Sequence, residues 1–199
     1  MDIGILVFHD VEELDFVGPL EVFGVAARIA GGITVQTVSK DGEGVRGRYG
    51  LRILPDQSFT TCPPLDLLIV PGGKGARERA QFDPATLQFV RRHAARAPIA
   101  SVCTGALILA AAGLLDNREA TTHWSAIKLL QAFPSVRVLE SVRFVYADDV
   151  ATSAGISAGI DLALEIVGRQ FGQNVAEQTA RVMEYTPGRA AQGSERSRT

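Results

Sequence analysis

Cys103 stands where a strand-like segment of the sequence changes directly into a helix-like segment. Residues 99–102 form a short apolar run of strand length, and residues 106–112 are rich in Ala and Leu, which favour helices. A strand that turns at once into a helix, with a nucleophile on the turn, is called a nucleophile elbow. Free backbone N–H groups at the helix start are expected to lower the pKa of the thiol. The alternative interpretation is an inert cysteine buried in a core strand.

Two consecutive glycines are the best candidates for binding a developing negative charge near this thiol. Gly72 and Gly73 follow the apolar run 66–70, and glycine lets the backbone approach a ligand closely. Together with the amide of Thr104, their N–H groups could form an oxyanion hole, for which two backbone donors suffice. The alternative is that the glycines provide only a tight exit from a strand.

A nucleophilic thiol also requires a group that handles protons, and the sequence offers two candidates. Asp15 ends an acidic loop just before the first predicted helix, where its carboxyl group could reach Cys103, although helix capping is an alternative role. His123 could act as the base, because histidine commonly partners a reactive thiol, or it could be a packed structural histidine. His9 and His93 have no convergent polar neighbours and are interpreted as structural or surface residues.

The elements that must position these groups alternate between strands and helices along the chain. The apolar runs predict strands over residues 3–8, 33–38, 66–70, 99–102 and 120–124, and hairpins over 42–54, at a sheet edge, and 142–152. Helices are expected over residues 18–30, with Pro19 in the first turn, and over 84–96, 106–112, 125–133, 155–171 and 175–183. This alternation predicts an α/β sandwich around a mostly parallel sheet. Asp15, Gly72, Gly73 and Cys103 all follow strand ends, where such sheets form their sites, which favours a functional thiol.

Composition limits the classes of function. The chain has 199 residues, of which 46% are hydrophobic and 21% charged, with a formal net charge of −2. We therefore expect one domain, residues 1–185, followed by a mobile tail, 186–199. The charge argues against binding nucleic acid through bulk positive charge, and no apolar run approaches the roughly 20 residues of a membrane span. Without a leader-like N-terminus, a cytoplasmic location is expected. Cys62, Cys103 and the three histidines lack the spacing of a metal site.

Several segments together resemble one protein family. These segments are residues 12–23, 70–73, 101–105, 120–124 and 155–159. In this order they resemble the PfpI/ThiJ superfamily, and within it they are most similar to the isonitrile hydratase branch. The resemblance implies a flavodoxin-like three-layer α/β/α sandwich and a homodimer.

The resemblance also assigns roles to individual residues. It implies that Cys103 is the nucleophile and that Asp15 is its acidic partner, at a position where many superfamily members carry Glu. Thr104 stands where the protease-like members carry His, which favours the hydratase branch over a protease. His123 matches a motif histidine near the site, and Ile156 matches a position whose backbone contacts the site.

The implied reaction is the hydration of a small isonitrile to an N-formamide. The Cys103 thiolate would attack the terminal carbon to give a thioimidate, and Asp15 would protonate the carbon and then activate water. This chemistry needs no metal and no organic cofactor. Two other classes remain open: a ligand-sensing or regulatory domain, related to those fused to helix-turn-helix modules, and a redox or aldehyde-defence protein in which Cys103 is oxidised. The region after Thr186 shows no helix-turn-helix pattern.

Overall fold

A seven-stranded sheet forms the centre of the molecule, for which the computed structural model describes residues 1–188. The strand order is β10-β11-β7-β6-β1-β2-β5, and every neighbouring pair is parallel except β10 and β11. The strands are β1 (Asp2–Leu6), β2 (Thr34–Ser39), β5 (Gln57–Ser58), β6 (Leu67–Val70), β7 (Ile99–Val102), β10 (Phe144–Ala147) and β11 (Val150–Ser153). The predicted mostly parallel sheet is confirmed, as is the hairpin over residues 142–152.

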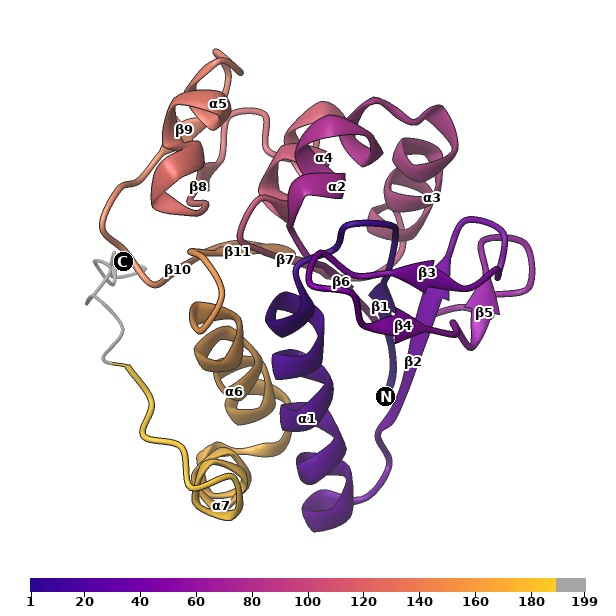
Figure 1. Ribbon diagram of the computed structural model, residues 1–199. Coiled ribbons are helices and arrows are strands. Elements are labelled where there is room, and N and C mark those ends of the chain that lie inside the picture. The colour runs from indigo at the N-terminus through magenta and orange to yellow at the C-terminus, as the bar shows by residue number, and fades with distance from the viewer. Residues whose placement is uncertain (189–199) are drawn as a thin grey trace.

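Helices cover both faces of this sheet, so the predicted three-layer sandwich is also confirmed (Figure 1). One face carries α1 (Glu13–Ala30), α6 (Ala158–Phe171) and α7 (Gln173–Val182). The other carries α2 (Lys74–Glu78), α3 (Pro84–Ala94), α4 (Gly105–Ala111) and α5 (Ile127–Gln131), with the 3-10 turns η1 (Ala80–Phe82) and η2 (Trp124–Ala126). No helix in residues 1–188 combines the length and the apolar character that crossing a bilayer would require.

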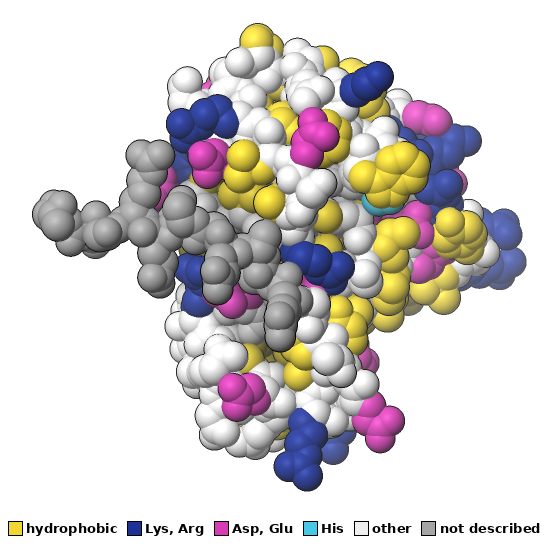
Figure 2. Space-filling view, turned by 90° about the vertical axis from the view of Figure 1, so that its left-hand side faces the viewer, with side chains coloured by type: hydrophobic (Ala, Val, Ile, Leu, Met, Phe, Trp, Pro, Cys, Tyr) yellow, Lys and Arg dark blue, Asp and Glu magenta, His cyan; other side chains and the backbone are white. Residues whose placement is uncertain are grey.

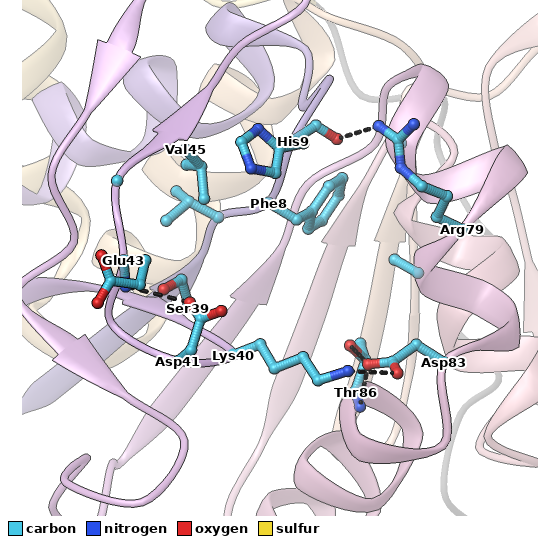
Figure 3. Close-up of a pocket in the computed structure, with 14 residues that line it drawn as sticks. Phe8, His9, Ser39, Lys40, Asp41, Glu43, Val45, Arg79, Asp83 and Thr86 are labelled. Atoms are coloured by element: carbon cyan, nitrogen blue, oxygen red, sulfur yellow. Dashed lines mark hydrogen bonds and ion pairs between the residues drawn. The ribbon is translucent and has the colours of Figure 1, made fainter.

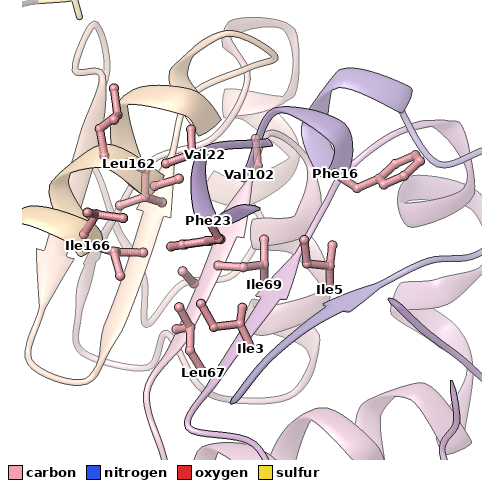
Figure 4. Close-up of a cluster of buried hydrophobic side chains, with 14 of the residues drawn as sticks. Ile3, Ile5, Phe16, Val22, Phe23, Leu67, Ile69, Val102, Leu162 and Ile166 are labelled. Carbon is pink, nitrogen blue, oxygen red and sulfur yellow. The ribbon is translucent and has the colours of Figure 1, made fainter. Parts of the chain in front are cut away.

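The inner strands β1 and β6 are almost continuously apolar because they are buried on both sides. Ile5 and Ile69 point toward the helices α1 and α6, where they meet Phe23 and Leu162 (Figure 4). Leu68, one residue before Ile69, points to the opposite face and joins the second core cluster. Since successive strand residues alternate between faces, both faces require hydrophobic side chains.

The first helix begins earlier than the sequence pattern predicts. Helix α1 starts at Glu13, so Pro19 lies inside the helix and not in its first turn. The prediction was wrong because Glu13 and Asp15 also suit a first turn, where acidic groups meet the positive end of the helix dipole. As a consequence Asp15 is fixed by a helix and not by a loop.

The hairpin over residues 42–54 does not extend the edge of the main sheet, as was expected. Its strands β3 (Val45–Arg46) and β4 (Arg52–Ile53) form a separate antiparallel pair. The hairpin binds the acidic loop instead: the Asp10 amide donates to the Arg46 carbonyl over 2.8 Å, and the Arg48 amide donates to the Val11 carbonyl over 2.9 Å. These bonds hold the entry to α1 in place.

A second small sheet follows the elbow, in which β8 (Glu119–Ala120) pairs with β9 (Arg137–Val138). The predicted strand over 120–124 is therefore shorter than expected and leads into the turn η2. Of the tail expected over 186–199, residues 189–199 lie outside the described part of the chain.

Candidate active site

Cys103 occupies a nucleophile elbow between β7 and α4. Its φ is 56°, a left-handed conformation that costs a residue with a side chain about 1–2 kcal/mol. Bonds on both sides hold this conformation: the Cys103 amide donates to the carbonyls of Ser153 (3.1 Å) and Ala154 (3.2 Å), and Thr122 Oγ1 donates to the Cys103 carbonyl over 2.8 Å. The predicted elbow is therefore present, and neighbouring strands enforce its geometry.

Asp15 is fully buried in the first turn of α1 and lies against the elbow. Its Oδ2 accepts a hydrogen bond from the Gly72 amide over 3.0 Å. The thiol of Cys103 and the amide of Ile156 also contact this carboxyl group. Within residues 1–188, Oδ1 has no partner in full hydrogen-bond geometry. The structure thus brings Asp15, Cys103 and Ile156 together, with one carboxyl oxygen still able to accept a proton.

Burial is the main cause of a raised pKa in both central groups. Burial raises the pKa of Asp15 to about 7, and the charge of Glu12 adds to the rise while the Gly72 hydrogen bond opposes it. Burial followed by the Asp15 charge raises the pKa of Cys103 to about 12, although the Thr104 amide acts in the opposite direction. The expectation of a lowered thiol pKa is wrong, because burial and a neighbouring carboxylate outweigh the helix start. Near neutral pH the thiol keeps its proton, and Asp15 is the group that gains or loses one.

The glycine pair serves to position the site. Thr104 Oγ1 accepts from the Gly73 amide over 2.9 Å and donates to the Gly73 carbonyl over 3.2 Å. Because Asp15 engages the amide of Gly72, neither glycine N–H is open to a ligand as the sequence led us to expect. The Thr104 amide, in contrast, contacts the thiol. A Cβ atom at Gly72 would lie 2.4 Å from the Thr104 amide nitrogen, so this close approach requires glycine.

His123 borders the site and does not contact the thiol. Its ring packs on Gly155, where a Cβ would lie 2.0 Å from His123 Cδ2. Its Nδ1 bonds to the Ser125 hydroxyl over 2.8 Å and accepts from the Ser125 amide over 3.3 Å. Within the described residues no hydrogen bond joins His123 to Cys103, so the structure gives no support to a Cys–His pair. Burial also lowers the pKa of His123, which keeps the ring neutral.

Three further residues shape the site and were not identified from the sequence. Thr122 is buried and donates to the carbonyl of Cys103. Its place directly before the motif histidine His123 was the signal in the sequence that could have identified it. Glu12 is nearly buried, donates its amide to the Gly72 carbonyl over 3.0 Å, and pairs with Arg48 over 3.2 Å. No local pattern marks Arg48, because a hairpin distant in sequence brings it to the site.

A separate pocket of about 330 Å³ lies beside Phe8 and His9, away from the residues of the predicted site (Figure 3). Its walls come from the ends of β1 and β2, from α2 and from the start of α3. Its Lys and Arg side chains are paired: Lys40 bonds to Asp83 over 2.8 Å, and Arg79 bonds to Asp10. None of the predicted site residues lines it.

The residues described contain no group of three His, Cys, Asp or Glu side chains arranged to hold a metal ion. The polar groups around Cys103 are, in contrast, arranged for proton transfer. The pairing of a buried thiol with a carboxyl group of raised pKa suits the addition of a nucleophile coupled to protonation.

Known proteins share this architecture. The isonitrile hydratase of Pseudomonas putida is 38% identical over 188 residues, which cover 94% of this chain and 79% of the hydratase. The HTH-type transcriptional regulator GbdR of Pseudomonas aeruginosa is 32% identical over 92% of this chain, which spans 50% of the regulator. The crystal structure of a THiJ/PfpI family protein from Pseudomonas syringae superposes with a TM-score of 0.85 at 37% identity, over 94% of this chain and 76% of that one. The DJ-1/PfpI family model matches residues 1–169, and the chain belongs to this family.

Proposed function

We propose that the protein hydrates small isonitriles to N-formamides through a covalent intermediate on Cys103. The observation that carries the proposal is the buried pair of Cys103 and Asp15, in which burial raises the pKa of the carboxyl group to about 7. The similarity to an isonitrile hydratase supports the same reading. Such a pair can move one proton between sulfur, carbon and water without a second base.

In the first half-reaction, Asp15 removes the proton of the Cys103 thiol as sulfur bonds to the terminal carbon of the isonitrile. Asp15 then delivers this proton to the same carbon. One C–S bond and one C–H bond form, and the product is a thioimidate on Cys103. The carboxylate is restored, so the pair returns to its starting charge.

In the second half-reaction, Asp15 takes a proton from water as the water oxygen bonds to the thioimidate carbon, and the nitrogen receives that proton. The C–S bond then breaks, the hydroxyl proton passes through Asp15 to the sulfur, and the N-formamide leaves. The sum is the addition of one water to one isonitrile. The Thr104 amide, which contacts the thiol, is placed to stabilise negative charge on the sulfur.

The direct test is to incubate the protein with an alkyl isonitrile and to measure the formamide by its formyl proton in NMR spectra. Turnover by the unmodified protein and none by Cys103→Ala is the expected result. Turnover that is unchanged in Cys103→Ala would remove the nucleophile from the proposal.

A second candidate function is ligand sensing without turnover, which the similarity to the GbdR regulator favours. It predicts that isonitriles or other small ligands bind near Cys103 while no formamide forms. A redox role is less well supported, because the raised pKa of Cys103 leaves little thiolate to oxidise. A cysteine protease is also disfavoured, since no histidine contacts the thiol among the described residues.

We also propose that the protein forms a homodimer through the start of α1 and the hairpin β3–β4. Large hydrophobic side chains are exposed on these elements: Leu14, Tyr49, Leu51 and Leu54. Figure 2 shows hydrophobic side chains gathered toward the right-hand edge of the molecule in that view. A second copy can cover such a patch with the same patch, as two-fold symmetry requires.

A further inference from the structure

Next to the glycine pair of the site stands a cationic side chain that no described residue neutralises. Helix α2 follows Gly73 directly, and the Arg77 amide donates to the Gly73 carbonyl over 3.4 Å, so Arg77 stands one helical turn beyond the glycine pair. Its side chain is half-buried. Within residues 1–188 the Arg77 guanidinium forms neither an ion pair nor a hydrogen bond. A half-buried guanidinium without a partner retains its capacity to bind an anion.

A second guanidinium stands on the neighbouring hairpin. Arg48 is held there by Glu12, which in turn bonds to the backbone of Gly72. The ion pair neutralises the Glu12 charge while 40% of the Arg48 side chain stays exposed. Arg48 therefore offers hydrogen-bond donors beside the glycine pair, and its pairing compensates the charge of Glu12.

Both arginines flank Gly73 in the fold: the Arg77 amide donates to the Gly73 carbonyl, and the Arg48 amide donates to the carbonyl of Val11, which pairs with Gly73 in an isolated β-bridge. After burial, the charges of Arg77 and Arg48 lower the pKa of His123, and the charge of Glu12 acts in the opposite direction. His123 packs on Gly155, next to Ile156, whose amide contacts Asp15.

The carboxylates nearby do not cancel the charge of Arg77. Glu13 accepts the Tyr49 amide over 2.7 Å within the hairpin, and Glu78 pairs with Lys74 on α2. The pKa of Asp15 is raised to about 7, so Asp15 is only partly charged near neutral pH. Within residues 1–188 none of these carboxylates pairs with Arg77, so its guanidinium stays able to bind a carboxylate from a ligand.

We infer that Arg77, assisted by Arg48, binds a carboxylate on the substrate and selects small electrophiles that carry one. The carboxylate follows from the arginines, whereas the isonitrile group rests on the proposed function. Together they give an isocyano acid as the preferred substrate class. A guanidinium suits this role because its planar donors match a carboxylate in two parallel hydrogen bonds. In the pocket of Figure 3 the Lys40 ammonium and the Arg79 guanidinium are already paired with carboxylates, so neither is a comparable group.

The test compares 3-isocyanopropanoate with 3-methylbutyl isonitrile, a neutral molecule of the same shape. We expect the unmodified protein to favour the carboxylate in kcat/KM by about tenfold, the size typical of a partly desolvated charge contact. Arg77→Met should remove most of this preference and leave kcat/KM for the neutral substrate within about twofold of the unmodified protein, and Arg77→Lys should restore part of the preference.

Arg28→Met, which removes an exposed arginine of α1, is the charge-matched control and should leave the preference unchanged. Equal values for the two substrates in the unmodified protein, or equal losses in Arg77→Met, would overturn the inference.

A second measurement separates this inference from the proposed function. Iodoacetate and iodoacetamide both alkylate Cys103 with loss of iodide, and they differ in charge. We expect Arg77→Met to lower the ratio of the iodoacetate rate to the iodoacetamide rate at Cys103 about fivefold, with Cys62 as the internal reference in the same mass spectrum. A changed ratio without isonitrile turnover would contradict the hydratase and support the carboxylate site. Turnover of both isonitriles with an unchanged ratio would support the hydratase and contradict the carboxylate site.

Discussion

Gly72 donates its backbone N–H to Asp15 Oδ2 over 3.0 Å, and this bond holds the carboxyl group against the elbow of Cys103. The contact joins the exit of β6 to the first turn of α1, two elements that are adjacent only in the folded chain. Since the other oxygen, Oδ1, has no formed hydrogen bond among the described residues, the carboxyl group is anchored on one side and reactive on the other. The proposed chemistry depends on this arrangement.

Replacing Gly72 with alanine should disrupt the site. The added Cβ would lie 2.4 Å from the Thr104 nitrogen and 3.0 Å from Asp15 Oδ2, so the elbow and the acid must move apart. We expect Gly72→Ala to lower kcat for formamide production at least a hundredfold and to destabilise the fold by about 1–3 kcal/mol in urea unfolding.

Gly24→Ala is the matched control for this prediction. A Cβ at Gly24 meets nothing within 4 Å, and the position lies inside helix α1. We expect unchanged turnover and a stability gain of about 0.5–1 kcal/mol, the usual advantage of Ala over Gly in a helix. Full activity in Gly72→Ala would show that the close approach is not required.

Turnover should rise with pH through the ionisation of Asp15. The proposed reaction starts with Asp15 as a carboxylate and Cys103 as a thiol, which is the state of the pair between the two raised pKa values. We therefore expect kcat/KM for a neutral isonitrile to increase up to a pH of about 7 and then to stay level well into the alkaline range. A rate that falls as pH increases through 7 would indicate that protonated Asp15 starts the reaction.

Asp15→Asn should inactivate the protein and stabilise its fold. The folded-state pKa of Asp15 lies above its ordinary value, so the native state holds the proton longer than the unfolded state and stability decreases as pH increases from about 4 to about 7. Asparagine keeps a side-chain oxygen for the Gly72 amide and carries no charge. We expect Asp15→Asn to exceed the unmodified protein in free energy of unfolding by roughly 2–4 kcal/mol at pH 8 and much less at pH 4. Equal differences at both pH values would exclude a buried carboxylate as the cause.

Thr122→Val tests the support of the elbow. The substitution keeps the shape of the side chain and removes the donor to the Cys103 carbonyl, which then stays buried without this partner. We expect a loss of about 1–3 kcal/mol in stability and a severalfold decrease in turnover, with both restored in Thr122→Ser. Unchanged turnover in Thr122→Val would mean that the strand bonds of Cys103 hold the elbow alone.

The proposed dimer can be tested by light scattering after size exclusion. We expect a species of twice the 21.2 kDa chain mass, and a monomer after Leu51→Glu combined with Leu54→Glu. Leu129→Glu, at an exposed leucine of α5, is the control and should leave the dimer intact. A monomeric unmodified protein, or a dimer that survives the double substitution, would contradict the proposed interface.

The parts of the site that were predictable from the sequence are those set by local pattern. The strand before Cys103 and the helix after it are continuous in sequence, and parallel strands place their carboxyl ends at one edge, so the meeting of Cys103, Asp15 and the glycines could be inferred. The start of α1 could not, because proline favours the first turn of a helix and is unfavourable in the interior, where the fold nevertheless places Pro19. The pKa of Cys103 was expected in the wrong direction, since it depends on burial and on Asp15, which no local pattern measures. The role of Arg48 depends on how a hairpin folds back, which its glycine-rich sequence does not specify.

The most direct test of the central claim is the formation of N-formamide from an alkyl isonitrile, followed by NMR in parallel samples of the unmodified protein, Cys103→Ala and Asp15→Asn. We expect a growing formyl signal with the unmodified protein and only the uncatalysed background with either variant, while circular dichroism shows that all three are folded. An unmodified protein that gives no formyl signal above background, or a Cys103→Ala variant that matches it, would contradict the account.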